Sequence, residues 1–459
     1  MPGHWLTEMD TPICDFVRDY ARREPLRLHM PGHKGGSLLG MERLDITEIS
    51  GADSLYEAAG IIARSEENAG ALFGCRTVYS TEGASQCIRA MLYLVRLHGL
   101  GLGRRPRVLA GRNAHKAFLS GAALLDMEVE WLYPQSSSGY LSCDITAEEL
   151  DRLLETAEEK PAAVYLTSPD YLGKMADIPG IARVCHNHGV LLAVDNAHGA
   201  YLKFLPESLH PMDLGADICC DSAHKTLPGL TGAAYLHLSP ELDRAFGSRI
   251  KDGLMLFGST SPSYLILQSL DAVNLYLETY PRKLCSFTER IRGLKSALTR
   301  QGYRLYGSEP LKLTVDAKAY GYEGEALAEY LRRQDMEPEF ADRDYLVLML
   351  TPELPETALK RLEEALCALP PRPPIDTPAP EAARGEPVLS LREAMLADSE
   401  LLPVHRCLGR ILAVPNLGCP PAVPILVCGE RITSRALEAF AYYGITHCRV
   451  VREAFRRLF

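Results

Sequence analysis

Several patterns that would exclude a soluble enzyme are missing from this sequence. It has no run of about 18 uncharged apolar residues, and residues 1–10 do not combine a basic region with an apolar core, so we expect neither a membrane segment nor a secretion signal. The 13 cysteines form no regular framework and no paired CxxC and HxxxH pattern, which favours reduced thiols in the cytoplasm and no metal site. Lys and Arg number 49 against 59 Asp and Glu, which argues against nucleic acid as a partner.

What the sequence does contain is enough apolar material, 47% of 459 residues, for two or three packed units. From about residue 77 to 238, short apolar segments alternate with helical patterns, which predicts parallel strands joined by crossover helices in an α/β core. The predicted strands are 107–110, 163–167, 190–195, 216–220 and 233–237. Each ends in polar residues, and open α/β sheets bind ligands beyond the carboxyl ends of their strands. We therefore expect the functional site at that edge.

The remainder of the chain predicts further packed segments. A helical pattern over 270–300 precedes a second α/β stretch, 303–369, with strands near 311–315 and 345–350. Residues 370–387 hold seven prolines, which is typical of an extended connector. The predicted organisation is an N-terminal arm (1–45), a large cofactor-binding domain (46–280), a small α/β domain (281–369), the proline-rich linker (370–387) and a C-terminal α+β domain (388–459).

The most specific chemistry lies in the stretch Asp221-Ser222-Ala223-His224-Lys225, which follows an apolar run. A lysine amine can form a Schiff base with an aldehyde, and Asp195, which ends another apolar run, could pair with a pyridinium nitrogen. A surface lysine and a turn-capping aspartate are the alternatives for each residue alone. Together Lys225 and Asp195 predict a pyridoxal phosphate enzyme. His198 either orients Asp195 or fills the strand–helix junction.

Two further segments fit that cofactor. Residues 80–85 precede a helical pattern, so the free backbone amides of the helix start and the hydroxyl of Ser85 could bind a phosphate, with Gly83 permitting its close approach. Helix capping alone is the alternative. His115 follows the strand predicted at 107–110 and could lie against the cofactor ring, although a histidine in a polar loop is more often exposed.

These residues carry a close family resemblance. The chain resembles the shorter bacterial members of the ornithine/lysine/arginine decarboxylase family, pyridoxal phosphate enzymes with an aspartate aminotransferase-like fold (fold type I). The matching stretches are 28–34, 80–85, 112–116, 195–199, 222–227 and 260–264, and in the C-terminal segment 391–394, 409–411, 420–424 and 429–430.

The resemblance implies specific roles. Lys225 would form the Schiff base, Asp195 would contact the pyridine nitrogen and His115 would stack on the ring. Around the phosphate it places Ala84, Ser85, Ser222 and His224. Thr260 and Ser261 would reach the cofactor of a neighbouring subunit, so it implies a homodimer or a higher homo-oligomer with shared active sites. The implied reaction is decarboxylation of lysine, arginine or ornithine to the amine and CO2, in polyamine biosynthesis.

Some positions depart from the family pattern and leave alternatives open. Glu82 and Ala84 stand where relatives often carry Asn and Thr, so the carboxylate of Glu82 must point away from a bound phosphate. A carboxylate for the basic side chain of the substrate could come from Glu430, or from Glu66 or Glu67, although a solvated position is the commoner state of each. Another reaction on the same fold, such as transamination or elimination, and a non-catalytic regulatory homologue are the alternative functions.

Overall fold

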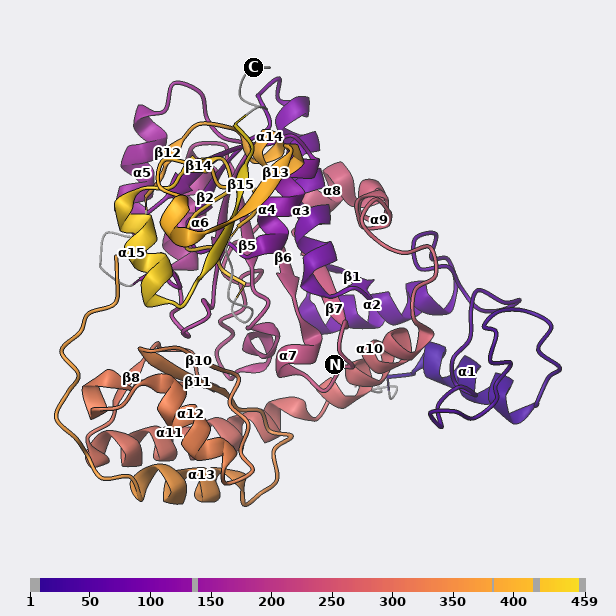
Figure 1. Ribbon diagram of the computed structural model, residues 1–459. Coiled ribbons are helices and arrows are strands. Elements are labelled where there is room, and N and C mark those ends of the chain that lie inside the picture. Colours follow the sequence, from indigo (N-terminus) through magenta and orange to yellow (C-terminus); the bar gives the residue numbers. More distant parts are fainter. Residues whose placement is uncertain (1–8, 134–138, 382–383, 416–421, 454–459) are drawn as a thin grey trace. The chain divides into compact units, whose positions relative to one another are not determined.

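The computed structural model describes residues 9–133, 139–381, 384–415 and 422–453, and its chain divides into two compact units. The first unit combines Met1–Leu94 with Asp195–Cys285, and the second combines Val95–Val194 with Ser286–Phe459. We describe each unit by itself (Figure 1).

The first unit is helical around a few strands. Its elements are α1 (Pro12–Arg22), α2 (Ile61–Phe73), β1 (Arg76–Ser80), the start of α3 (Gly83–Gly101), η1 (Ala200–Phe204), β6 (Ile218–Asp221), α7 (Ala223–Thr226), β7 (Ala234–Leu238), α8 (Pro240–Phe246), η2 (Gly247–Arg249), α9 (Ile250–Met255), α10 (Tyr264–Leu277) and the start of α11 (Tyr280–Gln301).

The second unit begins with alternating strands and helices. These are β2 (Arg107–Gly111), α4 (Lys116–Leu124), β3 (Glu128–Leu132), α5 (Ala147–Thr156), β4 (Ala163–Thr167), α6 (Ile178–Asn187) and β5 (Leu191–Asp195), whose last residue opens the other unit. The small α/β part follows with β8 (Arg304–Tyr306), β9 (Lys312–Asp316), η3 (Lys318–Tyr320), α12 (Gly324–Arg332), β10 (Phe340–Ala341), β11 (Tyr345–Met349) and α13 (Ala358–Cys367).

The C-terminal part of the second unit mixes short strands with helices. Its elements are β12 (Glu386–Pro387), α14 (Leu391–Leu396), β13 (Ser399–Pro403), η4 (Val404–Arg406), β14 (Glu430–Arg431), α15 (Ser434–Tyr442) and β15 (His447–Val451). Strand pairs β12–β14 and β13–β15 form two small antiparallel sheets. This agrees with the α+β composition expected for 388–459, whereas the predicted domain boundaries stay a prediction.

The large sheet has seven strands in the order β1-β7-β6-β5-β4-β2-β3. Strand β2 runs parallel to β3 and β4, whereas β7 runs antiparallel to β1 and β6. All five strands predicted for this region exist, with bounds that differ by no more than two residues. The expectation of a mostly parallel sheet is confirmed, and β7 is the exception to it. Strands β1 and β3 were missed, and β3 is hard to recognise because it carries Glu128 and Glu130 at the sheet edge.

Helix starts follow from local capping. The side chain of Thr146 accepts a hydrogen bond from Glu149 N at the start of α5, and the Glu149 carboxylate accepts one from Thr146 N. Ser390 and Glu393 form the same capping box at α14. These reciprocal bonds satisfy amide groups that a helix start leaves unpaired.

Among the described residues, no helix has the length and apolar character that a membrane crossing would require.

The segment between α1 and α2, residues 23–60, buries two charged side chains, Arg27 and Glu42. The guanidinium of Arg27 donates to the carbonyl oxygens of Glu42, Arg43 and Asp45. The carboxylate of Glu42 accepts from Leu38 N and Gly40 N at 2.7 and 2.9 Å, and these amides, with that of Leu39 foremost, hold the Glu42 pKa at about 2.

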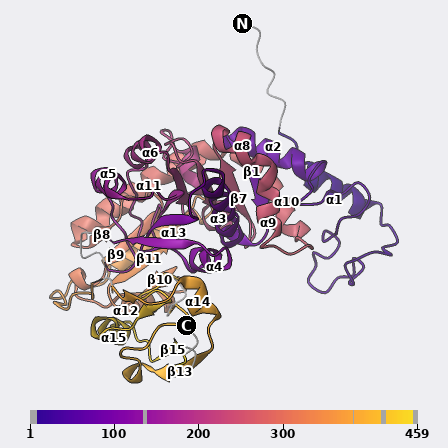
Figure 2. The same ribbon diagram turned by 90° about the horizontal axis from the view of Figure 1, so that it is seen from above.

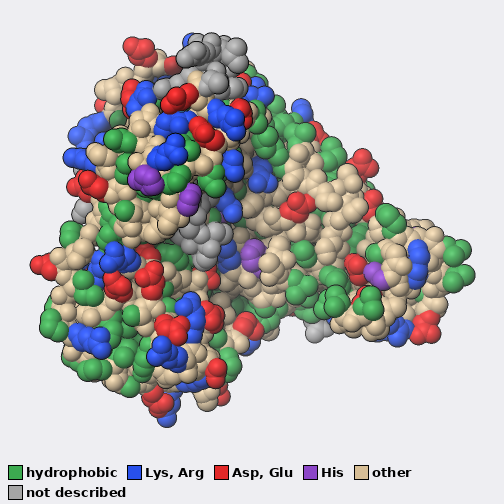
Figure 3. All heavy atoms as spheres, viewed as in Figure 1, with side chains coloured by type: hydrophobic (Ala, Val, Ile, Leu, Met, Phe, Trp, Pro, Cys, Tyr) green, Lys and Arg blue, Asp and Glu red, His purple; other side chains and the backbone are tan. Residues whose placement is uncertain are grey.

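Large apolar side chains remain exposed on this α1–α2 segment: Leu26, Leu28, Met30, Leu38, Leu39 and Met41. Figures 1 and 2 both show the segment extending away from α2 and α10, and Figure 3 shows hydrophobic side chains on its surface. A patch of this kind on a soluble protein indicates an interaction surface.

In the second unit, one core joins the C-terminal part to the rest. Phe440, Leu426 and Cys448 from the C-terminal part pack with Tyr171 and Phe340 in a single buried cluster. Packing of apolar side chains therefore holds the C-terminal part in the second unit, in addition to its covalent connection.

Replacing Leu426, which is fully buried in this cluster, tests that packing. We expect Leu426→Ala to lower the free energy of unfolding of the second unit by about 2–5 kcal/mol, because the lost side chain leaves a cavity. The control is Leu408→Ala, since Leu408 is 61% exposed. Chemical denaturation measures both, and equal stability of the two variants would contradict the assigned core.

Candidate active site

Lys225 and Asp195 both lie at strand ends in the first unit. Asp195 is the last residue of β5, and Lys225 lies in α7, which follows β6 directly. The Asp195 carboxylate is buried, and its Oδ1 accepts a hydrogen bond from Ala197 N at 3.1 Å. A 3.0 Å hydrogen bond joins Lys225 Nζ to His198 Nε2. His198 therefore contacts the lysine, a partner that sequence reasoning did not assign to it.

The start of α3 lies beside the loop that carries Lys225. Gly83 has a positive φ of +71°, and a Cβ built on it would lie 3.9 Å from His224 Cε1, so the imidazole borders this helix start. Gly83 N is itself engaged with Gly232 O at 2.8 Å. Ala84 is buried and Ser85 is half-buried. The structure thus brings the predicted phosphate residues of α3 next to the loop that carries His224.

The protonation of His224 follows from its surroundings. Its Nδ1 lies 3.0 Å from the carbonyl oxygen of Ala233. Burial lowers the pKa of His224, and the positive charge of Lys225 lowers it further. The hydrogen bond to the Ala233 carbonyl opposes this shift. A neutral imidazole with its proton on Nδ1 satisfies that geometry. Ser222, the N-cap residue of α7, is buried in the same loop.

Glu82 does point away from the helix start. Its Oε1 accepts a hydrogen bond from Ser259 N at 2.5 Å, and its backbone N donates to Ser80 Oγ at 3.1 Å. Through this bond the Glu82 carboxylate holds the loop that carries Thr260 and Ser261. The structure therefore accommodates Glu82 at a position where relatives often carry another residue. Both of those residues are exposed.

His115 lies in the second unit, at the N-cap of α4. Its Nδ1 accepts a hydrogen bond from Ala117 N at 3.1 Å, and the side chain is half-buried. Residues on both sides of His115 are bound to the C-terminal part: Lys116 N donates to Ala422 O at 3.0 Å, and Arg112 donates to the carbonyl oxygens of Pro424 and Ile425 at 3.0 and 3.2 Å. The stacking role of His115 stays a prediction.

Glu430 is buried beside Arg112 in the second unit. Its Oε2 accepts from Val427 N at 3.1 Å and lies 3.9 Å from Arg112 Nη2, and its Oε1 accepts from Tyr133 OH at 3.4 Å. Burial raises the pKa of Glu430, and the nearby Arg112 opposes that shift. Its assignment to the substrate stays a prediction, and each of its described contacts is to a protein group.

The two alternative carboxylates differ from each other. Glu66 is buried, accepts from Tyr79 N at 2.8 Å and pairs with Lys251. Glu67 is exposed on α2. Burial raises the pKa of Glu66, against the attraction of Lys251. Glu66 therefore has a structural partner within its own unit.

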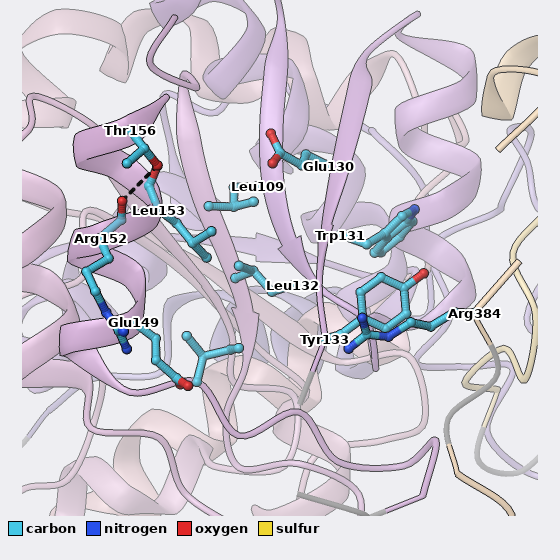
Figure 4. Close-up of a pocket in the computed structure, with 11 residues that line it drawn as sticks. Leu109, Glu130, Trp131, Leu132, Tyr133, Glu149, Arg152, Leu153, Thr156 and Arg384 are labelled. Atoms are coloured by element: carbon cyan, nitrogen blue, oxygen red, sulfur yellow. Dashed lines mark hydrogen bonds between the residues drawn. The ribbon is translucent and has the colours of Figure 1, made fainter. Parts of the chain in front are cut away.

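A hollow of about 460 Å³ lies in the second unit at the β3 edge of the sheet, between β3 and α5. Leu109, Leu132 and Leu153 line it together with charged groups of both signs, and Arg384 packs 4.3 Å over the ring of Tyr133 (Figure 4). None of the residues predicted to bind the cofactor lines this hollow.

Comparison with known proteins places this geometry in a class. The structure of a Francisella novicida lysine decarboxylase matches with a TM-score of 0.77 at 15% identity, covering 97% of this chain and 82% of that one. Lysine decarboxylase A from Pseudomonas aeruginosa matches with a TM-score of 0.75 at 18% identity, covering 95% and 76%. The fold is that of the fold type I, pyridoxal phosphate-dependent enzymes.

Sequence similarity narrows the class to a family. The model of the Orn/Lys/Arg decarboxylase major domain matches residues 11–301. Arginine decarboxylases from Bacillus subtilis and Halalkalibacterium halodurans are each 28% identical to this chain; they cover 94% and 93% of it, and 93% and 92% of their own lengths. The chain belongs to the Orn/Lys/Arg decarboxylase family and is an amino-acid decarboxylase.

The Arg112–Glu430 contact generates a pH-dependent prediction. Arg112→Met leaves the Glu430 carboxylate buried without its cation, so we expect a loss of about 3 kcal/mol in the free energy of unfolding at pH 8. A raised carboxyl pKa means that the folded protein favours the protonated acid, so the loss should shrink as the pH falls through the pKa of Glu430.

Denaturant unfolding at pH 8 and pH 5 measures this loss. Arg435→Met is the control, because Arg435 is exposed on α15. A loss that is independent of pH would contradict the pairing and leave only the lost hydrogen bonds to carbonyl oxygens as its cause.

Proposed function

We propose that this decarboxylase binds pyridoxal 5'-phosphate at the β5 and β6 strand ends of the first unit and acts on arginine, in the cytoplasm and in polyamine biosynthesis. The single observation that carries the proposal is the Lys225 amine, 3.0 Å from His198 Nε2 in the unit that holds the buried Asp195 and the α3 start. A lysine, a buried carboxylate and an anion-binding helix start are the groups that this cofactor requires.

The residues fit the cofactor in distinct roles. Lys225 holds it covalently through its amine, and His198 orients that amine and can exchange a proton with it. Asp195 provides a buried negative charge for a ring nitrogen, and Ala197 N fixes the direction of that carboxylate. When bound, the cofactor supplies an electron sink for the pair of electrons left on Cα as CO2 departs.

The phosphate is assigned to the start of α3 and to the α7 loop. Ala84 and Ser85 offer backbone amides, Ser85 adds a hydroxyl, and the helix start adds the positive end of its dipole, while Gly83 permits close approach. Ser222 and His224 face it from the α7 loop. Because the side chain at position 83 is absent, the space bordered by His224 Cε1 is open to an oxygen atom. His115 is proposed to stack on the ring.

We propose arginine rather than lysine as the substrate because the sequence alignments with arginine decarboxylases cover more of the chain. The proteins named arginine decarboxylase align over nearly their entire lengths. The lysine decarboxylase of Pseudomonas aeruginosa is 23% identical over only 60% of this chain and 41% of its own length.

Lys225→Ala tests the assignment directly. We expect purified wild-type protein to absorb visible light with bound cofactor and to release CO2 from arginine faster than from lysine or ornithine. The variant should lose the absorbance, and its CO2 release should fall by several orders of magnitude. Lys360→Ala, an exposed lysine of α13, is the control. Keto-acid formation without CO2 would place the protein among aminotransferases instead.

We also propose a homodimer held by the α1–α2 segment. Six of its large apolar side chains are exposed, while Arg27 and Glu42 bind backbone groups within the segment. A second copy of the chain is the expected partner, because Thr260 and Ser261 are also exposed in this unit and are proposed to reach the partner's cofactor.

Charges placed on the α1–α2 segment should separate the subunits. We expect wild-type protein to have twice the chain mass in light scattering, and Leu38→Asp with Leu39→Asp to shift it to the monomer, because burying two carboxylates at an interface is unfavourable. Leu100→Asp, at an exposed leucine of α3, should leave the dimer intact. A wild-type monomer would contradict the proposal.

A further inference from the structure

Asp221 is a fully buried carboxylate that none of the proposed catalytic steps uses. It ends β6, directly before the loop that carries Lys225. Its Oδ2 lies 3.0 Å from His210 Nε2 and 3.2 Å from His237 Nε2, and its Oδ1 accepts from Asn196 Nδ2 at 2.7 Å. A buried charge requires such partners, because an unpaired carboxylate would be strongly destabilising.

The hydrogen-bond geometry fits a positive charge on His237. The hydroxyl of Thr77 donates to Cys75 O at 3.2 Å, and its oxygen lies 2.9 Å from His237 Nδ1. If Nδ1 donates to that oxygen while Nε2 donates to Asp221, both ring nitrogens of His237 carry protons. His210 Nδ1 accepts a hydrogen bond from Met212 N at 3.4 Å.

The surroundings of His237 favour the cation. The ring of Phe73 lies 4.6 Å from the His237 ring, centroid to centroid. Burial alone would lower the pKa of His237, but the Asp221 carboxylate more than offsets this and the pKa is raised. The titratable groups that face the pair from the packed elements are Cys219 on β6, Cys75 before β1, Tyr235 on β7 and His210 in the loop before β6.

Asn196 connects this ion pair to both strand ends of the proposed site. It follows Asp195 directly, and its backbone N donates to Cys220 O at 3.0 Å while its side chain donates to Asp221. Its Oδ1 lies 2.0 Å from where a Cβ on Gly199 would be, so only glycine fits at that position. One amide side chain thus ties the residue after Asp195 to the residue that starts the Lys225 loop.

We infer that Asp221, paired with protonated His237 and bridged by Asn196, positions Asp195 and Lys225 for the cofactor. Asp221 and His237 are positioning residues, since they act through Asn196 and the strand ends and contact neither cofactor nor substrate. The inference deepens the proposed function and rests on it for the role of the cofactor. The ion pair between Asp221 and His237 does not depend on the proposed function.

The test compares three single variants. Asp221→Asn removes the charge and keeps the shape, and His237→Gln keeps a hydrogen-bond donor near the position of Nε2 without a charge. His405→Gln is the control, because His405 is exposed in the second unit. Circular dichroism first establishes that each variant is folded. Two measurements follow: thermal unfolding of cofactor-free protein between pH 5 and pH 9, and absorbance titration with pyridoxal phosphate.

The first measurement tests the ion pair alone. A histidine whose pKa is raised on folding stabilises fully below its unfolded value of about 6.5, and that stabilisation is lost as the pH rises through the folded value. Wild-type protein and His405→Gln should therefore lose stability across the alkaline part of the range, whereas His237→Gln should have a flatter profile.

The second measurement tests positioning. We expect Asp221→Asn and His237→Gln each to weaken cofactor binding about tenfold, since displacing the strand ends misplaces both Asp195 and Lys225. If His237→Gln keeps the wild-type pH profile, the ion pair is wrong. If the profile flattens while cofactor affinity is unchanged, the positioning role is wrong.

Two other results have separate meanings. The ligand-type atoms of His210, Cys219 and Asp221 all lie within 4.8 Å of one another, so one equivalent of tightly bound metal ion in purified protein would overturn the imidazolium assignment. If wild-type protein does not bind pyridoxal phosphate, the proposed function fails, while the pH profile still decides whether the ion pair exists.

Discussion

The carboxylate of Asp221 is the charge on which the arrangement of the first unit depends. It lies without solvent contact at the end of β6, where its hydrogen-bond partners among the described residues are His210, His237, Asn196 and Cys219. Because low local dielectric makes an unsatisfied charge costly, each of these partners must keep its place. The strand ends that carry Asp195 and the lysine loop are held by the same bonds.

Other carboxylates of this chain follow the same constraint with different partners. Glu82 binds a backbone amide of the loop near Thr260, Glu42 binds the amides of its own turn, and Glu430 binds Val427 N beside Arg112. In each case an acidic residue that looks unfavourable or merely solvated in the sequence organises a loop. Negative charge in this protein therefore shapes the backbone near functional segments as well as supporting solubility.

Membership of the decarboxylase family and the local geometry support each other without being the same argument. The family match covers residues 11–301, whereas the hydrogen bond between Lys225 and His198 is a property of this chain's own structure. The C-terminal part, beyond that match, contributes the carbonyl oxygens that bind Arg112 and Lys116 N, on either side of His115. Contacts from the C-terminal part therefore help to position the loop around His115.

The sequence by itself determined the α/β class, the five strands it predicted between 107 and 238 and the pairing of Lys225 with Asp195 as candidates, because apolar periodicity and strand-end polar residues are local signals. Only the tertiary structure decided the direction of β7, the existence of edge strand β3, the contact of His198 with Lys225 and the partners of Asp221. These depend on residues far apart in the chain, as His237 and Thr77 meet through strand pairing. Sequence spacing does not determine the protonation state of a buried histidine.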